Sequence, residues 1–317
     1  MKAPTEVATK GPSKEGWTET PERSNALALR VMAWIALRCG RRLARLVLHP
    51  IAAYFLVFGP SARRHSRRYL TRALGRPPTW IETYRHFHAF AAVTLDRVYL
   101  LRGNLAQFDI TVHDAAVAED VLADGRGAFL VGAHIGSFEV LRALGDSRTD
   151  LRIAMVMYAD NARLINEALQ AIAPDFSPKI IPLGRAGSML AIRDWLDGGG
   201  LAGVLADRVL PGESVRTAQL TIPFLGRDAV FGDGPFRLAA LLRRRVIFMV
   251  GNYLGGNRYD VRFDMLADFS RHDLSPADRD RLVSEAVIAY AARLEAVCRA
   301  HPTNWFNFHD FWLEDRP

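Results

Sequence analysis

The sequence predicts an α/β fold, in which a mixed, largely parallel central sheet is flanked by helices and follows an N-terminal membrane-associated helical extension. Short apolar runs, several of them bounded by glycine or proline, are typical of strands buried on both faces. These runs alternate with segments in which apolar residues recur every three or four positions, as expected for amphipathic helices. A chain of 317 residues, half of them hydrophobic, is also long enough to bury a sizeable core.

Composition divides the chain into three parts. Residues 1–22 are mostly polar and small, with three prolines, and predict a disordered tail without the pattern of a signal peptide. Residues 23–80 predict basic and apolar helices that associate with a membrane, and residues 81–317 predict the α/β domain.

The extension is strongly basic. It has no Asp or Glu from Ser24 to Ile81, so the net charge of +7 is concentrated there. On a helix over residues 27–47, arginines gather on one side and apolar residues, with Trp34, on the other. The arginines of that stripe are Arg30, Arg38, Arg41, Arg42 and Arg45. This pattern is typical of an interfacial membrane helix. A solvated arginine face on a core helix is the alternative, and no recognition motif supports nucleic-acid binding.

The next apolar run, residues 46–59, is interrupted by His49 and Pro50. At about 14 residues it is shorter than the roughly 20 that a straight spanning helix needs. We therefore expect monotopic attachment at the cytoplasmic face of a membrane, where arginines meet anionic lipid.

Besides a helix that begins near Phe138, the α/β part is expected to contain six strands and five helices. The strands are residues 128–131, 151–158, 179–183, 201–206, 246–250 and 259–263. The helices are residues 80–101, 160–171, 189–196, 236–242 and 278–300, and residues 209–216 are expected to form a mobile loop.

The turn after the first of these strands carries the chemistry. His134 follows the strand, Gly136 suits a tight turn, and Ser137 is a candidate N-cap for a helix whose first turn holds Glu139. Ligands bind at the carboxyl edge of open α/β sheets. A carboxylate bonded to one imidazole nitrogen fixes the tautomer, so that the other nitrogen acts as a general base. A buried structural histidine beside an ordinary helix start is the alternative.

No enzyme nucleophile is evident, because the sequence has no G-x-S-x-G elbow and its two cysteines lie far from His134. The activated hydroxyl would then belong to the substrate, which indicates direct acyl transfer to an alcohol. The sequence shows no metal-ligand cluster and predicts no cofactor.

The spacing H-x-x-x-x-E from His134 to Glu139 resembles the motif of the glycerolipid acyltransferase superfamily. The local sequence GAHIGSFE is most similar to the lipid A late acyltransferase branch of that superfamily. Further similar blocks are Ala206-Asp207-Arg208, Pro223-Phe224-Leu225-Gly226 and Gly234-Pro235. The aromatic residues 304–312 resemble a sub-branch found with aryl polyene pathways.

The resemblance implies an acyltransferase that takes an acyl group from an acyl carrier protein thioester and passes it to a lipid or glycolipid hydroxyl. His134 and Glu139 would be the catalytic pair. Backbone amides of the turn or Arg208 would hold the oxyanion. The expected substrate-binding residues are Gly136, Ser137, Arg185, Asp207, Arg208, Phe224 and Gly226.

One departure from the branch concerns the acceptor. An arginine usual after the second strand is replaced by Tyr158-Ala159, with Arg163 one helical turn on, which does not favour a phosphorylated lipid A precursor. Two other functions stay open: a non-catalytic module that binds an acyl carrier or lipid, and a thioester hydrolase. The aromatic residues 304–312 are expected to dock on the sheet or to sit at the lipid boundary.

Overall fold

A computed structural model describes residues 26–140, 152–158, 179–208, 219–271 and 275–312. The central sheet has the strand order β1-β9-β8-β2-β5-β3-β4, and every neighbouring pair is parallel except β8 with β9. Its strands are β1 (Asp109–His113), β2 (Ala128–Gly132), β3 (Ile153–Tyr158), β4 (Ile180–Leu183), β5 (Leu201–Leu205), β8 (Arg245–Gly255) and β9 (Arg258–Asp268). The prediction of a mixed, largely parallel sheet flanked by helices is confirmed.

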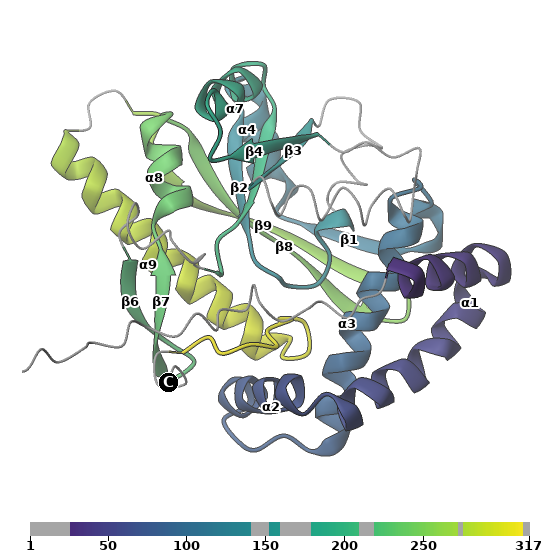
Figure 1. The fold of residues 1–317 in the computed structure, drawn as a ribbon. Coiled ribbons are helices and arrows are strands. Elements are labelled where there is room, and N and C mark those ends of the chain that lie inside the picture. The colour runs from purple at the N-terminus through teal and green to yellow at the C-terminus, as the bar shows by residue number, and fades with distance from the viewer. Residues whose placement is uncertain (1–25, 141–151, 159–178, 209–218, 272–274, 313–317) are drawn as a thin grey trace, which may run out of the picture.

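Helices cover both faces of the sheet (Figure 1). Alternate residues of β2 point to opposite sides: Phe129 and Val131 join one core cluster, and Ala128 and Leu130 join the other. The first cluster is covered by α2 (Pro60–Leu74), α7 (Ser188–Asp197), α8 (Gly234–Leu241) and α9 (Pro276–Ala300). The second is covered by α1 (Ala26–Phe58), α3 (Trp80–Leu100) and α4 (Ala115–Ala123).

Five elements were not predicted from the sequence. They are β1, α4, the two strands of a separate antiparallel hairpin, β6 (Gln219–Phe224) and β7 (Arg227–Gly232), and a short 3-10 helix, Leu105–Gln107, which precedes β1. All six expected strands are present. The expected helix over residues 160–171 and the expected loop over residues 209–216 lie outside the described residues.

The N-terminal helix differs from its prediction. It continues through Pro50 to Phe58 instead of ending near residue 47, and it is broken at Gly40, whose φ of 80° is not helical. A second helix, α2, follows directly after Gly59. No single helix among the described residues is long and apolar enough to cross a membrane, although the bent pair Leu37–Phe58 and Pro60–Leu74, at 95°, passes that test by length and composition.

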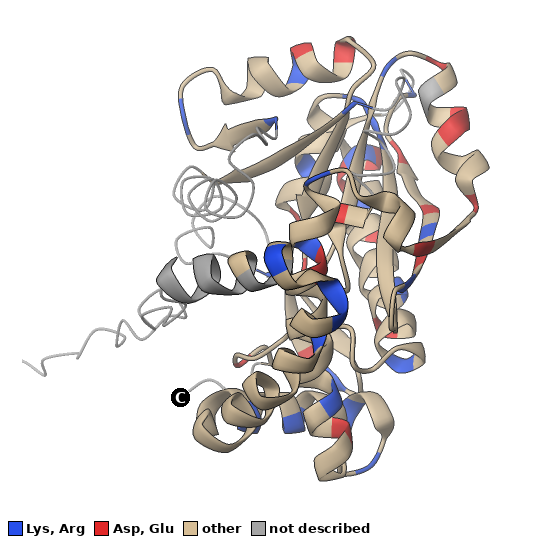
Figure 2. Ribbon diagram, turned by 90° about the vertical axis from the view of Figure 1, so that its right-hand side faces the viewer, with Lys and Arg blue, Asp and Glu red and all other residues tan. Residues whose placement is uncertain are grey.

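The structure shows which side of α1 packs on the protein. Arg41 donates two hydrogen bonds of 2.8 Å to the buried carboxylate of Asp96, and Arg45 donates to the hydroxyl of Tyr253. These arginines therefore face the protein, because Asp96 would otherwise be a buried carboxylate without a cation. Leu43 and Leu46, on the apolar side, are more than half exposed. In Figure 2 the arginines of α1 and α2 are blue, and neither helix carries an acidic residue.

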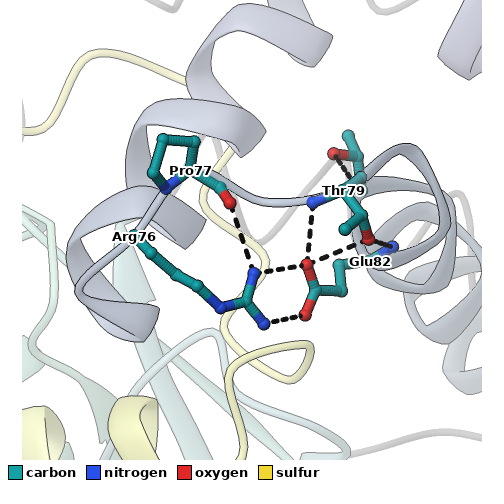
Figure 3. Close-up of polar contacts among 5 residues, drawn as sticks. Arg76, Pro77, Thr79 and Glu82 are labelled. Atoms are coloured by element: carbon teal, nitrogen blue, oxygen red, sulfur yellow. Dashed lines mark hydrogen bonds and ion pairs between the residues drawn. The ribbon is translucent and has the colours of Figure 1, made fainter.

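The start of α3 follows from a capping box. The Thr79 hydroxyl accepts a hydrogen bond from the amide of Glu82, whose carboxylate accepts one from the amide of Thr79. Arg76 holds both oxygens of that carboxylate, at 2.6 and 3.0 Å (Figure 3). This fixes the direction in which α3 leaves α2.

Candidate active site

His134 lies at the carboxyl edge of the sheet, as predicted. It follows β2 by two residues, and Asp207 follows the adjacent parallel strand β5 by two residues. The equal offset from two paired strands brings the side chains together, because carboxyl ends of parallel strands meet at one edge. The Nδ1 atom of His134 is 2.9 Å from Oδ1 of Asp207.

The carboxylate that bonds His134 is therefore not the one expected from the motif. Glu139 instead forms an ion pair of 2.7 Å with Nε of Arg97, from α3, and accepts a hydrogen bond of 3.2 Å from the Ser137 hydroxyl. The physical reason is direction: Glu139 is in a helix that leaves the sheet edge, whereas Asp207 sits beside His134 on the neighbouring strand. The predicted contact between Glu139 and the imidazole is wrong.

Asp207 is fully enclosed, and both of its oxygens are hydrogen-bonded. Its Oδ2 atom accepts from the backbone amide of His134 at 3.1 Å and from the indole Nε1 of Trp305 at 2.9 Å. Burial alone would raise the pKa of Asp207, whereas the charge and hydrogen bond of His134 lower it. Further lowering by Arg208 and Trp305 leaves the pKa well below its usual range, so the carboxylate is ionised.

An ionised Asp207 determines which imidazole nitrogen can act. A carboxylate only accepts hydrogen bonds, so Nδ1 of His134 carries the proton and Nε2 holds the lone pair. The side chain of His134 is one-third exposed, whereas that of Asp207 is 1% exposed. The arrangement can therefore accept a proton from a hydroxyl at Nε2, which is the chemistry of a general base.

Gly136 makes the turn possible. Its φ is 51°, and a Cβ atom there would lie 1.9 Å from the carbonyl oxygen of Gly251 on β8. The sequence argument for glycine at this position is confirmed. Ser137 is fully buried, and the following residues, from Phe138, are helical as expected.

The backbone amides of the turn are not available for an oxyanion. Each donates within the protein: residue 134 to Asp207, residue 135 to Ala133, residue 136 to Asn304 and residue 137 to Gly251. Of the two predicted oxyanion holders, the amides of residues 134–137 are therefore excluded. Arg208 directly follows Asp207, and its guanidinium lies 3.5 Å from the carbonyl oxygen of Phe306.

The remaining predicted substrate-binding residues are not hydrogen-bonded to His134. Arg185 is exposed after β4, and two strands, β3 and β5, separate β4 from β2. Gly226 forms the two-residue turn between β6 and β7, and Phe224 is buried against the rings of Trp305 and Trp312. Their role in substrate binding stays a prediction.

The sequence argument missed Arg97, Asn304 and Trp305. The many aromatic residues among 304–312 indicated that this segment is buried or at a lipid boundary, but nothing in their spacing assigned them to the site of His134. The structure docks them on the protein: Trp305 and Trp312 are each 1% exposed, and His309 is partly buried. Burial, aided by the charge of Arg208, lowers the pKa of His309 to about 3, so this imidazole is neutral.

Among the described residues, no group of three His, Cys, Asp or Glu side chains is placed to hold a metal ion. Comparison with known proteins gives one family. The model described as bacterial lipid A biosynthesis acyltransferase matches residues 22–314. No curated protein matches the chain.

Proposed function

The chain belongs to the bacterial lipid A biosynthesis acyltransferase family, and from that premise we propose that it transfers an acyl group from an acyl carrier protein thioester to a hydroxyl of a lipid or glycolipid. The observation that carries the proposal is the His134–Asp207 pair at the carboxyl edge of the sheet. A pair that can deprotonate a hydroxyl suits direct transfer to an acceptor alcohol.

In the proposed mechanism, Nε2 of His134 takes the proton of the acceptor hydroxyl as the oxygen attacks the thioester carbonyl. Asp207 keeps the proton of the imidazole on Nδ1 and stabilises the imidazolium that forms. Collapse of the tetrahedral intermediate breaks the carbon–sulfur bond, and the imidazolium returns its proton to the leaving thiolate. The products are the acylated lipid and the free carrier thiol.

The oxyanion of the intermediate needs a donor other than the turn amides. We propose Arg208, because it adjoins Asp207 in the chain and because the amides of residues 134–137 are already used. Removal of a single oxyanion donor in other acyl-transfer enzymes lowers kcat by about 10²–10³. We expect a loss of that order for Arg208→Met, measured as acyl transfer in vitro.

Attachment to the cytoplasmic face of a bacterial inner membrane is the second part of the proposal. Support comes from the large apolar side chains that α1 exposes: Trp34, Leu37, Leu43, Leu46, Tyr54, Phe55, Val57 and Phe58. Exposed apolar surface of this extent is typical of interaction sites. Arg38 and Arg42, exposed on the same helix, would meet anionic headgroups.

A flotation experiment tests the attachment. The full chain should float with vesicles that contain anionic phospholipid, and the double variant Leu43→Glu, Leu46→Glu should stay behind. Ile288→Glu is the matched control, since Ile288 is also half exposed but lies on α9. Flotation of the double variant at the level of the control would refute attachment through α1.

Transfer itself is tested by mass spectrometry of lipids after incubation of acyl carrier thioester and membrane lipid with the protein. The wild type should form an acylated lipid, and His134→Ala should form none while staying folded. His113→Ala is the control, because His113 also pairs with a carboxylate, Asp260, at 2.6 Å on a different strand pair. Free fatty acid without acylated lipid would instead identify a hydrolase, and activity of His134→Ala equal to wild type would refute the mechanism.

A further inference from the structure

The segment Asn304–Phe306 runs directly against the turn that carries His134. The amide of Gly136 donates to the carbonyl of Asn304 at 3.0 Å, and the amide of Phe306 donates to the carbonyl of His134 at 2.9 Å. Ile135 and Trp305 thus form an antiparallel bridge. The backbone of His134 is tied to a segment some 170 residues away in the chain.

The side chain of Trp305 reaches the carboxylate behind His134. Its Nε1 atom donates to Oδ2 of Asp207 at 2.9 Å, while Oδ1 faces Nδ1 of His134 at the same distance. A carboxylate turns easily about its last torsion, for which rotamer preferences are broad. Donors on Oδ2 restrict this rotation and keep Oδ1 directed at the imidazole.

Trp305 is itself rigidly held. Edge-to-face ring contacts surround the indole, with centroids 4.9–5.5 Å away, from Tyr69, Phe224 and Phe311. The Asn304 side chain brackets Tyr253 of β8, accepting from its amide at 2.7 Å and donating to its carbonyl at 3.0 Å. The carbonyl of Trp305 lies 2.8 Å from Nε2 of the buried His86. A donor fixed on all sides is suited to orient its acceptor.

We propose that Trp305 is a positioning residue for acyl transfer, which acts on His134 through the carboxylate of Asp207. The proposal rests on the proposed function, since it requires His134 to be the base. Without the indole N–H, Asp207 rotates more freely and presents less well-defined geometry to Nδ1. With one donor fewer on Asp207, its negative charge also stabilises the imidazolium more strongly, so the acid limb of the kcat profile moves to higher pH.

The test compares Trp305→Phe with Trp312→Phe in the full chain. Both indoles are 1% exposed and each donates one hydrogen bond, but that of Trp312 goes to the carbonyl of Phe224. We expect Trp305→Phe to lower kcat on the order of 10- to 100-fold with little change in KM. Trp312→Phe should keep kcat within about threefold of wild type. Equal losses in the two variants, or a Trp305→Phe profile identical to that of wild type, would overturn the proposal.

A double-mutant cycle covers the case in which Trp305→Phe is also less stable. If Trp305 acts through Asp207, Trp305→Phe changes kcat little in an Asp207→Asn background. A full-sized further loss in that background would show a purely structural role and overturn the proposal. If Asp207→Asn and His134→Ala both transfer normally, the proposed function fails instead, so the two failures are distinguishable.

Discussion

Two helix starts in this protein place a glutamate in the same surroundings. Glu82, at the start of α3, meets the hydroxyl of Thr79 and the guanidinium of Arg76. Glu139, in the first turn after the His134 loop, meets the hydroxyl of Ser137 and the guanidinium of Arg97. A hydroxyl and an arginine around a carboxylate are thus a recurrent way of stabilising a helix N-terminus here.

The comparison shows that position in a motif does not establish contact with the base. Glu139 has the partners of an ordinary helix-start glutamate, and the partner of His134 comes from the next strand. The two sites differ in burial, because Glu139 is largely buried next to the catalytic turn while Arg76 and Glu82 lie at the surface. Changes at Glu139 should therefore disturb the turn, and changes at Glu82 should not.

The largest expected effect is on kcat, and it distinguishes Asp207 from Glu139 as the partner of His134. Asp207→Asn should lower kcat by about 10³–10⁴, because an amide can donate to Nδ1 and select the wrong imidazole tautomer. Glu139→Gln should lower kcat less, by about 10- to 100-fold, through a loosened turn. Steady-state transfer rates of both folded variants measure this. A larger loss for Glu139→Gln would restore Glu139 as the partner of the base.

The next expected effect is on stability and transfer, and it differs between the glycines that precede the two helices. Gly136→Ala should lower both the transfer rate and the melting temperature strongly, since its Cβ would overlap the backbone of Gly251 and its φ is 51°. Gly75→Ala, at the end of α2, has a φ of 70° but open space around the added Cβ. It should cost only about 1 kcal/mol of unfolding free energy, with transfer unchanged. Similar melting curves for both variants would contradict the close approach at Gly136.

A pH effect should arise where α2, α3 and the C-terminal segment meet. His86 lies 2.8 Å from both the Ser66 hydroxyl and the Trp305 carbonyl, and burial lowers its pKa to about 4. The unfolded chain takes up a proton near pH 6.5 and the folded chain does not, so stability is lost as pH falls from about 6.5 to about 4. The loss should approach about 3 kcal/mol. Denaturant unfolding of wild type and His86→Gln over this range measures it, and equal pH slopes would refute the assignment.

The smallest expected effect is at the surface. Hydrogen bonds from Arg76 and Thr79 lower the pKa of Glu82 to about 2. The ionised carboxylate therefore stabilises the folded chain above the unfolded pKa of Glu82, and this stabilisation is lost as pH falls towards 2. Glu82→Gln should lower the melting temperature by no more than about 2 °C near neutral pH. It should leave transfer at the wild-type rate. A loss of transfer comparable to that of Glu139→Gln would show that the two helix starts are not functionally distinct.

The sequence predicted the parts of the site that depend on local patterns. Apolar runs located β2 and β5, and their ends placed His134 and Asp207 at one edge. The prediction of Glu139 instead of Asp207 as the partner of His134 was wrong, because the partner depends on which strands are neighbours in the sheet. Strand β1 was missed because most of its residues are exposed and give no apolar run.

The same limit applies to α1 and Trp305. The periodicity of α1 showed two faces but not which one packs on the protein, and that was decided by the distant carboxylate of Asp96. The bond from Trp305 to Asp207 joins residues 98 apart in the chain. Contacts between residues so far apart in the chain depend on which elements are neighbours in the fold, and they leave no periodic signal in the sequence.

The position of Trp305 near the end of the described chain has a consequence for biosynthesis. Synthesis proceeds from the N-terminus, and domains fold as their residues emerge. The helices with exposed apolar residues and the strand before His134 are therefore made long before the segment that fixes Asp207. If α1 attaches to a lipid surface as proposed, the nascent chain reaches that surface before Asn304–Phe306 has been made. The turn that carries His134 is then completed only after attachment.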